Sequence, residues 1–205
     1  MNVVARDRTT AATGVALGAA TVVAWVVLAG YEPPMGLAGF LAGWTLMMAA
    51  MMLPSIAPLL LLYSGPRAPL VASYLVVWSA IGLLPYAAME WGFAPALPIV
   101  LALAGIYELT PLKTACLRRC RNAASFLMER YRSGPLRLGV AHAVWCVGCC
   151  VGLMAVLVLA ASMGLVWAAA IGAAVFVQKV LPLGERSARL TGVGLLAAAA
   201  ALAVA

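Results

Sequence analysis

One apolar stretch, residues 141–154, holds the single histidine of the chain, three of its five cysteines and a methionine. At about 3.6 residues per helical turn, these side chains fall on or near one face of a helix. They are His142, Cys146, Cys149 or Cys150, and Met154. Imidazole, thiol and thioether groups are donors that soft transition metals prefer, and the thioether favours copper over zinc. The spacing therefore predicts a metal site on this helix.

Two further cysteines, Cys116 and Cys120, are four residues apart and would share one helix face. All five cysteines fall on or near the predicted cytoplasmic half, where thiols stay reduced. Cys149 and Cys150 are adjacent, so a bridge between them would be strained. Free thiols are therefore expected, and we predict that Cys116 and Cys120 form a relay or a second metal site.

Methionines gather in the apolar segment 36–63, which also contains Pro54. They occupy positions 47, 48, 51 and 52. Met51 and Met52 are predicted to lie at the depth of the adjacent cysteines, so together with Met154 they are candidate secondary ligands. The alternative is that the methionines only fill gaps in the core. Pro54 frees a backbone carbonyl and is expected to kink the helix.

A few polar residues accompany the apolar segments near their predicted inner ends. Ionisable groups within membrane spans are costly and therefore are candidates for function. Glu108 is accordingly a further candidate ligand. Lys113, Gln178 and Lys179 are expected to have supporting or structural roles, because a lysine near a helix end can extend to the interface and pair with a carboxylate.

The composition indicates the elements that must position these groups. Hydrophobic residues make up 66% of the 205 residues and charged residues 9%, against about 45–50% and about 25% in soluble domains. The mean hydropathy is +1.08. We predict an all-α, polytopic transmembrane helix bundle, with residues 1–205 forming a single transmembrane domain. Seven apolar segments are close to or longer than the roughly 20 residues that a membrane span requires. They are 12–30, 36–63, 69–89, 96–112, 138–160, 163–181 and 187–205.

The charged residues predict an orientation. If the N-terminus is cytoplasmic, all 13 basic residues lie on the inner side, and the outer loops keep only Glu32 and Glu90. This indicates an N-in, C-out protein of the bacterial cytoplasmic (inner) membrane. Arg6 and Arg8 before an apolar run also occur in signal peptides, but the length of the run favours a retained span. No basic patch is interleaved with aromatic residues, so we expect no nucleic-acid partner.

The basic stretch 113–133 carries apolar and charged residues at helical spacing. Its cysteines share one side with Leu127 and Tyr131, and its arginines lie opposite. This pattern predicts an amphipathic helix on the cytoplasmic side between the fourth and fifth spans. Its arginines would face anionic lipid head groups of the bilayer.

Four motifs occur in order from the second to the sixth predicted span. They are Met47-Met48-Ala49-Ala50-Met51-Met52-Leu53-Pro54; Tyr107-Glu108-Leu109-Thr110-Pro111-Leu112-Lys113-x-x-Cys116-Leu117-x-x-Cys120-Arg121; His142-x-x-x-Cys146-x-Gly148-Cys149-Cys150; and Lys179-x-x-Pro182. This set resembles a bacterial family described as predicted metal-binding integral membrane proteins, of unassigned function. The resemblance implies that the histidine and cysteines belong to a metal site, and it supplies no reaction. Gln178 stands where the resemblance leads us to expect Glu, so that side chain offers an amide oxygen without a charge.

Three functions are compatible with these residues. The first is binding of a soft metal, copper favoured over zinc, for handling, export or delivery, with a metal chaperone or membrane protein as partner. No Gly-x-x-x-x-Gly-Lys-Ser/Thr motif occurs, so no nucleotide is expected. The second is a thiol–disulfide and quinone redox protein, which the lack of cysteines on the predicted outer side disfavours. The third is a membrane scaffold or assembly subunit whose cysteines only pack. We identify no catalytic residues and do not favour an enzyme.

Overall fold

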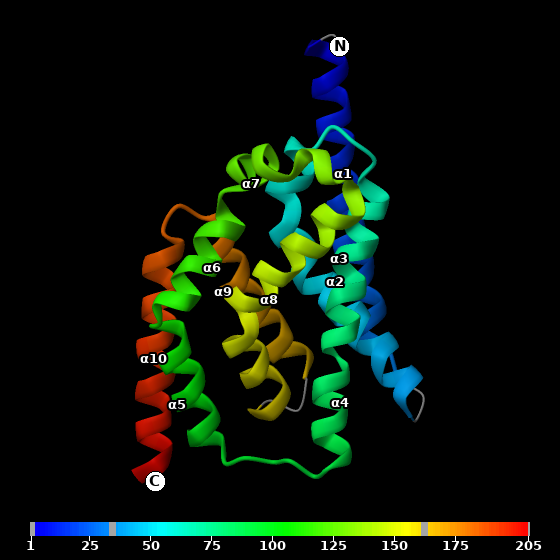
Figure 1. Ribbon diagram of the computed structural model, residues 1–205. Coiled ribbons are helices and arrows are strands. Elements are labelled where there is room, and N and C mark those ends of the chain that lie inside the picture. Colours follow the sequence, from blue (N-terminus) through cyan, green and yellow to red (C-terminus); the bar gives the residue numbers. More distant parts are fainter. Residues whose placement is uncertain (1–2, 33–35, 161–163, 205) are drawn as a thin grey trace.

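The computed structural model describes residues 3–32, 36–160 and 164–204, which form a bundle of helices without strands (Figure 1). The helices are α1 (Val3–Ala29), α2 (Leu37–Leu62), α3 (Arg67–Ile81), α4 (Leu83–Glu90), α5 (Leu97–Glu108), α6 (Pro111–Arg121), α7 (Ala123–Arg130), the 3₁₀ turn η1 (Tyr131–Ser133), α8 (Pro135–Ala160), α9 (Leu165–Val180) and α10 (Gly184–Val204). The chain is therefore all-α, as predicted. The expected boundaries at 163 and 205 lie outside the described residues.

Each predicted apolar segment contains a helix or a helix pair. Gly82 separates α3 from α4, and the pair forms a single apolar stretch of 24 residues. Helices α5 and α6 are bent by 63° relative to each other. The second begins at Pro111, and the Thr110 hydroxyl accepts a hydrogen bond from the Lys113 amide at 3.2 Å. A capping threonine followed by proline is a strong helix start, so the bend follows from the local sequence.

Five of the described helical stretches are long and apolar enough to cross a membrane, and six if the bent pair of α5 and α6 counts as one. The five are α1, α2, α3 with α4, α8 and α10. Helix α9 is apolar but has only 16 residues. It would extend about 24 Å at 1.5 Å per residue, below the hydrocarbon thickness of about 30 Å. The predicted count of seven spans and the orientation stay predictions.

The basic stretch 113–133 forms two helices and a 3₁₀ turn where one helix was expected. The break falls at Asn122, whose side-chain oxygen accepts a hydrogen bond from the Ser125 amide at 3.1 Å. Asparagine is a preferred N-cap residue, so a new helix, α7, starts at this position. Cys116, Cys120 and Phe126 are buried, so the apolar side of both helices faces the bundle.

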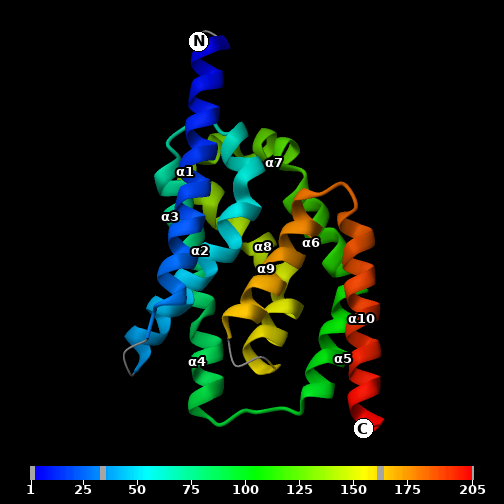
Figure 2. The same cartoon turned by 180° about the vertical axis from the view of Figure 1, so that it is seen from behind.

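Helix α8 is the centre of the packing, in contact with α3, α5, α6 and α9. Seen from behind, α10 lies along α5 at one edge, and α1 lies along α2 at the other (Figure 2). A Cβ on Gly139 of α8 would lie 2.3 Å from the Leu70 carbonyl oxygen of α3. Glycine is therefore required for these two helices to approach so closely.

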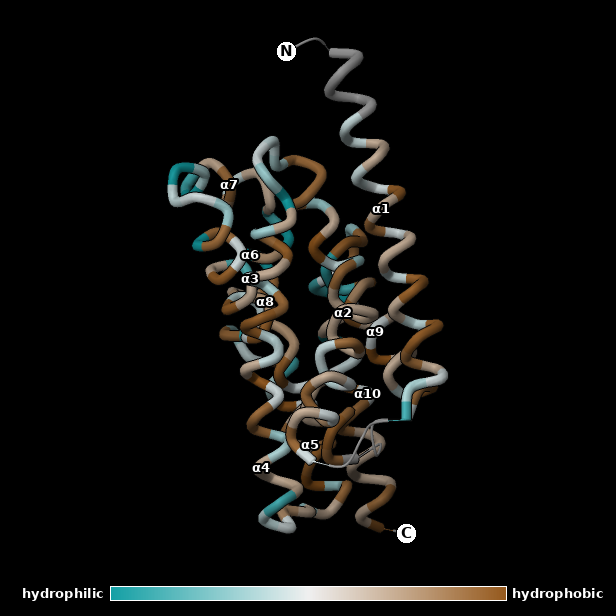
Figure 3. The backbone as a smooth tube through the Cα atoms, turned by 90° about the vertical axis from the view of Figure 1, so that its right-hand side faces the viewer, coloured by the Kyte–Doolittle hydropathy of each residue, from teal (hydrophilic) through white to brown (hydrophobic). Residues whose placement is uncertain are grey.

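Hydrophobic residues extend along the whole length of the helices, and hydrophilic ones gather most densely around α7 (Figure 3). Helix α2 passes through the core and buries Met47, Met48, Met51 and Met52 on all sides, and it continues through Pro54. The C-terminal end of α2 reaches the α7 end, where the Tyr63 ring meets Tyr131 with centroids 5.7 Å apart. The N-terminal part of α2 therefore lies toward the opposite end.

Candidate metal centre

Four thiols adjoin where α8 meets α6. The Cys149 sulfur lies 3.7 Å from that of Cys150 and 3.6 Å from that of Cys120. It is also 3.2 Å from the Cys146 carbonyl oxygen. All four side chains are buried and none forms a disulfide. The structure thus brings the two predicted cysteine groups together through Cys120 and Cys149.

Gly148 permits the close approach of α6 to α8 at this point. A Cβ on this residue would lie 2.8 Å from the Cys116 sulfur. The Tyr107 hydroxyl donates a short hydrogen bond to the Gly148 carbonyl and ties the end of α5 to the same turn. Cys116 is buried and faces α8, but no sulfur contact joins it to the other cysteines. It therefore lies beside the thiol group and outside its direct contacts.

Cys146 has polar partners from two other helices. The Lys179 ammonium of α9 donates to its sulfur at 2.7 Å, and the Tyr74 hydroxyl of α3 is 3.0 Å from it. The same ammonium is 3.4 Å from the Ser55 hydroxyl of α2. All of these side chains are buried. A buried ammonium needs an anionic or strongly polar partner, and the Cys146 sulfur is the nearest candidate.

His142 lies one helical turn from Cys146 and is 3% exposed. Its ring is flanked by Phe126 and Tyr74, with centroids 5.4 and 6.0 Å away. In the described part of the chain its Nδ1 is buried without a hydrogen-bond partner. A buried polar atom that lacks a partner requires an explanation, and an imidazole lone pair reserved for a metal ion is one.

Lys113 is fully buried behind the thiols. Its ammonium donates to Glu108 at 2.6 Å and to the Gln178 side-chain oxygen at 2.8 Å, and it also contacts the Cys149 carbonyl. The Gln178 amide donates to the second Glu108 oxygen at 3.1 Å. Glu108 is therefore engaged with an ammonium and an amide and does not reach the thiols. The network reaches the α8 backbone at Cys149, and the supporting role of Lys113 and Gln178 and the ligand role of Glu108 stay predictions.

Charged side chains outside the core connect the helices at the α7 end. Arg121 of α6 donates to three main-chain oxygens at the end of α9, those of Gln178, Leu181 and Pro182, at 2.7, 2.5 and 3.3 Å. Arg119 forms a two-fold ion pair with Glu129 of α7 at 2.7 and 2.6 Å. The hydrogen bonds from this arginine lower the pKa of the Glu129 carboxyl below its usual value.

The candidate thioethers belong to the same core. Met51, Met52 and Met154 are buried in one continuous cluster with the four adjoining thiols. Met51 also packs against Gly172 of α9, where an added Cβ would lie 3.3 Å from its Cγ. No sulfur–sulfur contact joins these methionines to the cysteines among the described residues. Their assignment as secondary ligands stays a prediction.

The thiol spacing fits a soft ion, although the side chains do not converge on one. Two sulfurs on a tetrahedral ion with bonds of about 2.3 Å would be about 3.8 Å apart, close to the 3.6 and 3.7 Å found here. Across the described residues, no three His, Cys, Asp or Glu side chains are placed to hold an ion together. Binding of one ion by several of these groups would therefore require some side chains to rotate.

Several contacting residues were missed from the sequence. Tyr74 and Ser55 touch the Cys146–Lys179 pair, yet each looks like an ordinary polar residue in an apolar span. Tyr107 carried a weak signal, since it belongs to the second motif. Arg121 ends the same motif, but nothing in the sequence indicated its hydrogen bonds to the end of α9.

Helices of spanning length, with buried thiols, an imidazole and thioethers in one core, define a class of helical proteins suited to soft metal ions. The family model described as PpoB2, copper chaperone, matches residues 41–202, and the chain belongs to this family. The match confirms the metal association that the motifs implied. The matched family is described as a copper chaperone. The sequence motifs had instead suggested a family of predicted metal-binding integral membrane proteins, and the match does not support that family. No curated protein and no solved structure matches the chain. Membership of the copper chaperone family indicates a function in copper handling or delivery.

Proposed function

We propose that this protein is an integral membrane copper chaperone that holds copper(I) between α6 and α8. Cys120, Cys146, Cys149 and Cys150 would supply the thiolates, and His142 would supply an imidazole nitrogen. The contact between the Cys120 and Cys149 sulfurs carries the proposal, because it joins two motifs that lie far apart in the sequence. Thiolates with a thioether nearby favour copper(I) over zinc.

The surface of the molecule supports a membrane location. Valines of α1 remain exposed, with Val22 at 61% and Val26 at 68%, and leucines of α5 and α10 behave similarly. A soluble monomer rarely exposes apolar surface of this extent, whereas lipid would cover it. The basic residues around α6 and α7 would then lie on the cytoplasmic side near anionic head groups, with the N-terminus inside and the C-terminus outside.

The supporting groups would have distinct tasks. Lys179 would balance the negative charge of the thiolates, and Lys113 would hold the Cys149 carbonyl in place. Cys116, beside the centre and toward the basic end, would act as a relay from a cytoplasmic donor protein. Met51, Met52 and Met154 would extend a thioether path away from that end.

Elemental analysis of protein purified without added metal tests the proposal. The wild type should retain copper, and the variant Cys146→Ser/Cys149→Ser/Cys150→Ser should lose it. Met128→Leu is a suitable control, because this methionine is 81% exposed on α7, whereas the candidate ligands are buried. Equal, near-zero copper in the wild type and the triple variant would refute the proposal.

A further inference from the structure

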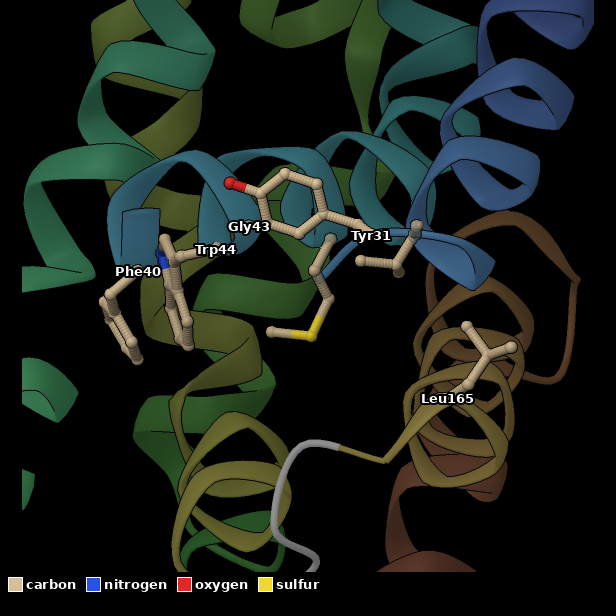
Figure 4. Close-up of a pocket in the computed structure, with 7 residues that line it drawn as sticks. Tyr31, Phe40, Gly43, Trp44 and Leu165 are labelled. Atoms are coloured by element: carbon tan, nitrogen blue, oxygen red, sulfur yellow. The ribbon is translucent and has the colours of Figure 1, made fainter. Parts of the chain in front are cut away.

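A pocket of about 180 Å³ opens beside the N-terminal part of α2, away from the α7 end. Its walls are aromatic and aliphatic, with a single thioether. They are formed by Leu28, Tyr31, Phe40, Gly43, Trp44, Met47 and Leu165. The Phe40 and Trp44 rings stand together on one side and Leu165 lies across from them, with Tyr31 above (Figure 4). The volume is similar to that of engineered cavities of about 150 Å³ that admit benzene.

The aromatic walls are held in place by specific contacts. The Trp44 indole nitrogen donates to the Trp78 carbonyl oxygen at 2.7 Å, and the Phe40 ring stacks on Trp44 at 6.2 Å. The Tyr31 hydroxyl donates to a main-chain oxygen of α2 at 3.2 Å. A Cβ on Gly43 would lie 2.9 Å from the Tyr31 ring. Glycine at this position therefore lets the tyrosine lie across the helix and shape the pocket.

The donors in this pocket select a narrow class of ligand. No carboxylate, imidazole or amine lines it, so it does not suit a hard divalent cation or zinc. A thioether is a soft donor, and an indole face attracts a cation. Met47 and Trp44 together fit a soft monovalent ion such as copper(I).

The pocket is connected to the thiol centre through α2. Met47 and Met51 lie one turn apart on the same side of the helix. Further along, the Ser55 hydroxyl donates to the Met52 carbonyl oxygen at 2.8 Å and touches Lys179, the partner of Cys146. Eight residues from Met47 to Ser55 cover about 12 Å of helix. The buried methionines of α2 therefore lie between the pocket, which Met47 lines, and Ser55, which contacts the partner of Cys146.

We propose that this pocket is the transfer site for copper(I), where the Met47 thioether and the Trp44 ring hold the ion and the acceptor protein supplies the remaining ligand. The inference rests on the proposed function, since the cysteine centre would load the site. A single sulfur leaves the coordination sphere of the ion incomplete. The remaining room in the pocket accommodates a methionine, cysteine or histidine side chain of the acceptor. The exchange is a ligand substitution, with no electron transferred.

Silver(I), a redox-stable ion of the same charge and softness, is the probe. Added to the full-length protein in detergent beyond the amount that the thiols bind, it should change the indole difference spectrum. Met47→Leu keeps the volume of the side chain and removes the sulfur. Met47→Leu should lower the affinity for the silver(I) that binds after the thiols are filled by at least about tenfold. Loss of a group that only supports a metal ligand already lowers metal affinity by about that factor. Trp44→Phe should remove the spectral change and weaken binding by about 2- to 30-fold.

Met48→Leu is the matched control, because Met48 is equally buried in α2 and does not line the pocket. It should bind silver(I) as the wild type does. Equal weakening in Met47→Leu and Met48→Leu, or a silver(I)-induced spectral change in Trp44→Phe as large as that in the wild type, would overturn the transfer site.

Copper retained during purification separates this inference from the proposed function. Met47→Leu should keep the wild-type content and pass copper(I) to a soluble chelator more slowly. Wild-type copper content with an unchanged transfer rate and unchanged silver(I) binding would refute the pocket alone. Loss of copper from every protein, including the wild type, would refute the cysteine centre, and the silver(I) titration would still decide on the pocket.

Discussion

Replacing Lys113 by methionine tests whether the buried ion pair behind the thiols holds the site together. The lysine is fully buried, and its ammonium serves Glu108, Gln178 and the Cys149 carbonyl at once. Its removal leaves the Glu108 carboxylate buried without a counter-charge. Breaking a buried pair in this way costs about 3–5 kcal/mol. For a chain of this length, that corresponds to a fall in the unfolding midpoint of about 6–20 °C.

The assay is thermal unfolding in detergent, followed by tryptophan fluorescence, combined with elemental analysis of the folded protein. The charge-balanced variant Glu108→Gln/Lys113→Met removes both charges. It should recover most of the lost stability, because replacing both partners of a buried pair is often close to neutral. The copper content of Lys113→Met should fall, because the Cys149 backbone loses its support. An unchanged midpoint in Lys113→Met, or a double variant as unstable as the single one, would refute the reasoning.

Three further predictions concern the thiols, the Cys146 hydrogen bond and the surface. Cys149→Ala removes the thiol that touches two others and should lower copper(I) affinity at least about tenfold in chelator competition; Cys116→Ala should have a smaller effect, and equal losses would contradict the assignment. Tyr74→Phe removes the hydroxyl beside the Cys146 sulfur and should lower the free energy of unfolding by about 1 kcal/mol; an unchanged midpoint would show that this contact contributes nothing. The lowered pKa of the Glu129 carboxyl means that its ion pair contributes above the ordinary pKa and is lost as the pH falls through the lowered value. Glu129→Gln should therefore flatten the acid side of a stability profile measured down to about pH 3, a small effect for an exposed pair; an acid side as steep as that of the wild type would count against the pair.

The sequence predicted the helices better than the contacts between them. Apolar length, together with Gly and Pro breaks, is a local property, and every predicted segment contains a helix. The number of membrane spans is less well determined by the sequence, because α9 is short and α5 is bent relative to α6. The soft-donor motif on α8 was recognisable, because imidazole and thiols at helical spacing are rare in an apolar run.

The arrangement across helices was not accessible from local patterns. The 3.6 Å contact between Cys120 and Cys149 depends on how α6 folds back after the bend. Tyr74 reaches Cys146 because α3 and α8 approach closely at Gly139, which no spacing rule predicts. Such contacts join residues far apart in the chain and depend on packing of the whole bundle.

The hydrogen bonds of Arg121 to the end of α9 connect two parts of the site. Arg121 directly follows Cys120, and its guanidinium holds the main chain beside Lys179, the partner of Cys146. A rotation of α6 that carried Cys120 away from Cys149 would therefore pull on α9 as well. Helix α8 is tied to the same group, because Lys113 of α6 contacts its Cys149 carbonyl and Lys179 of α9 donates to its Cys146 sulfur. The three helices that carry the thiols and their lysine partners therefore form one hydrogen-bonded unit, in which a change at any one of them is felt at the other two.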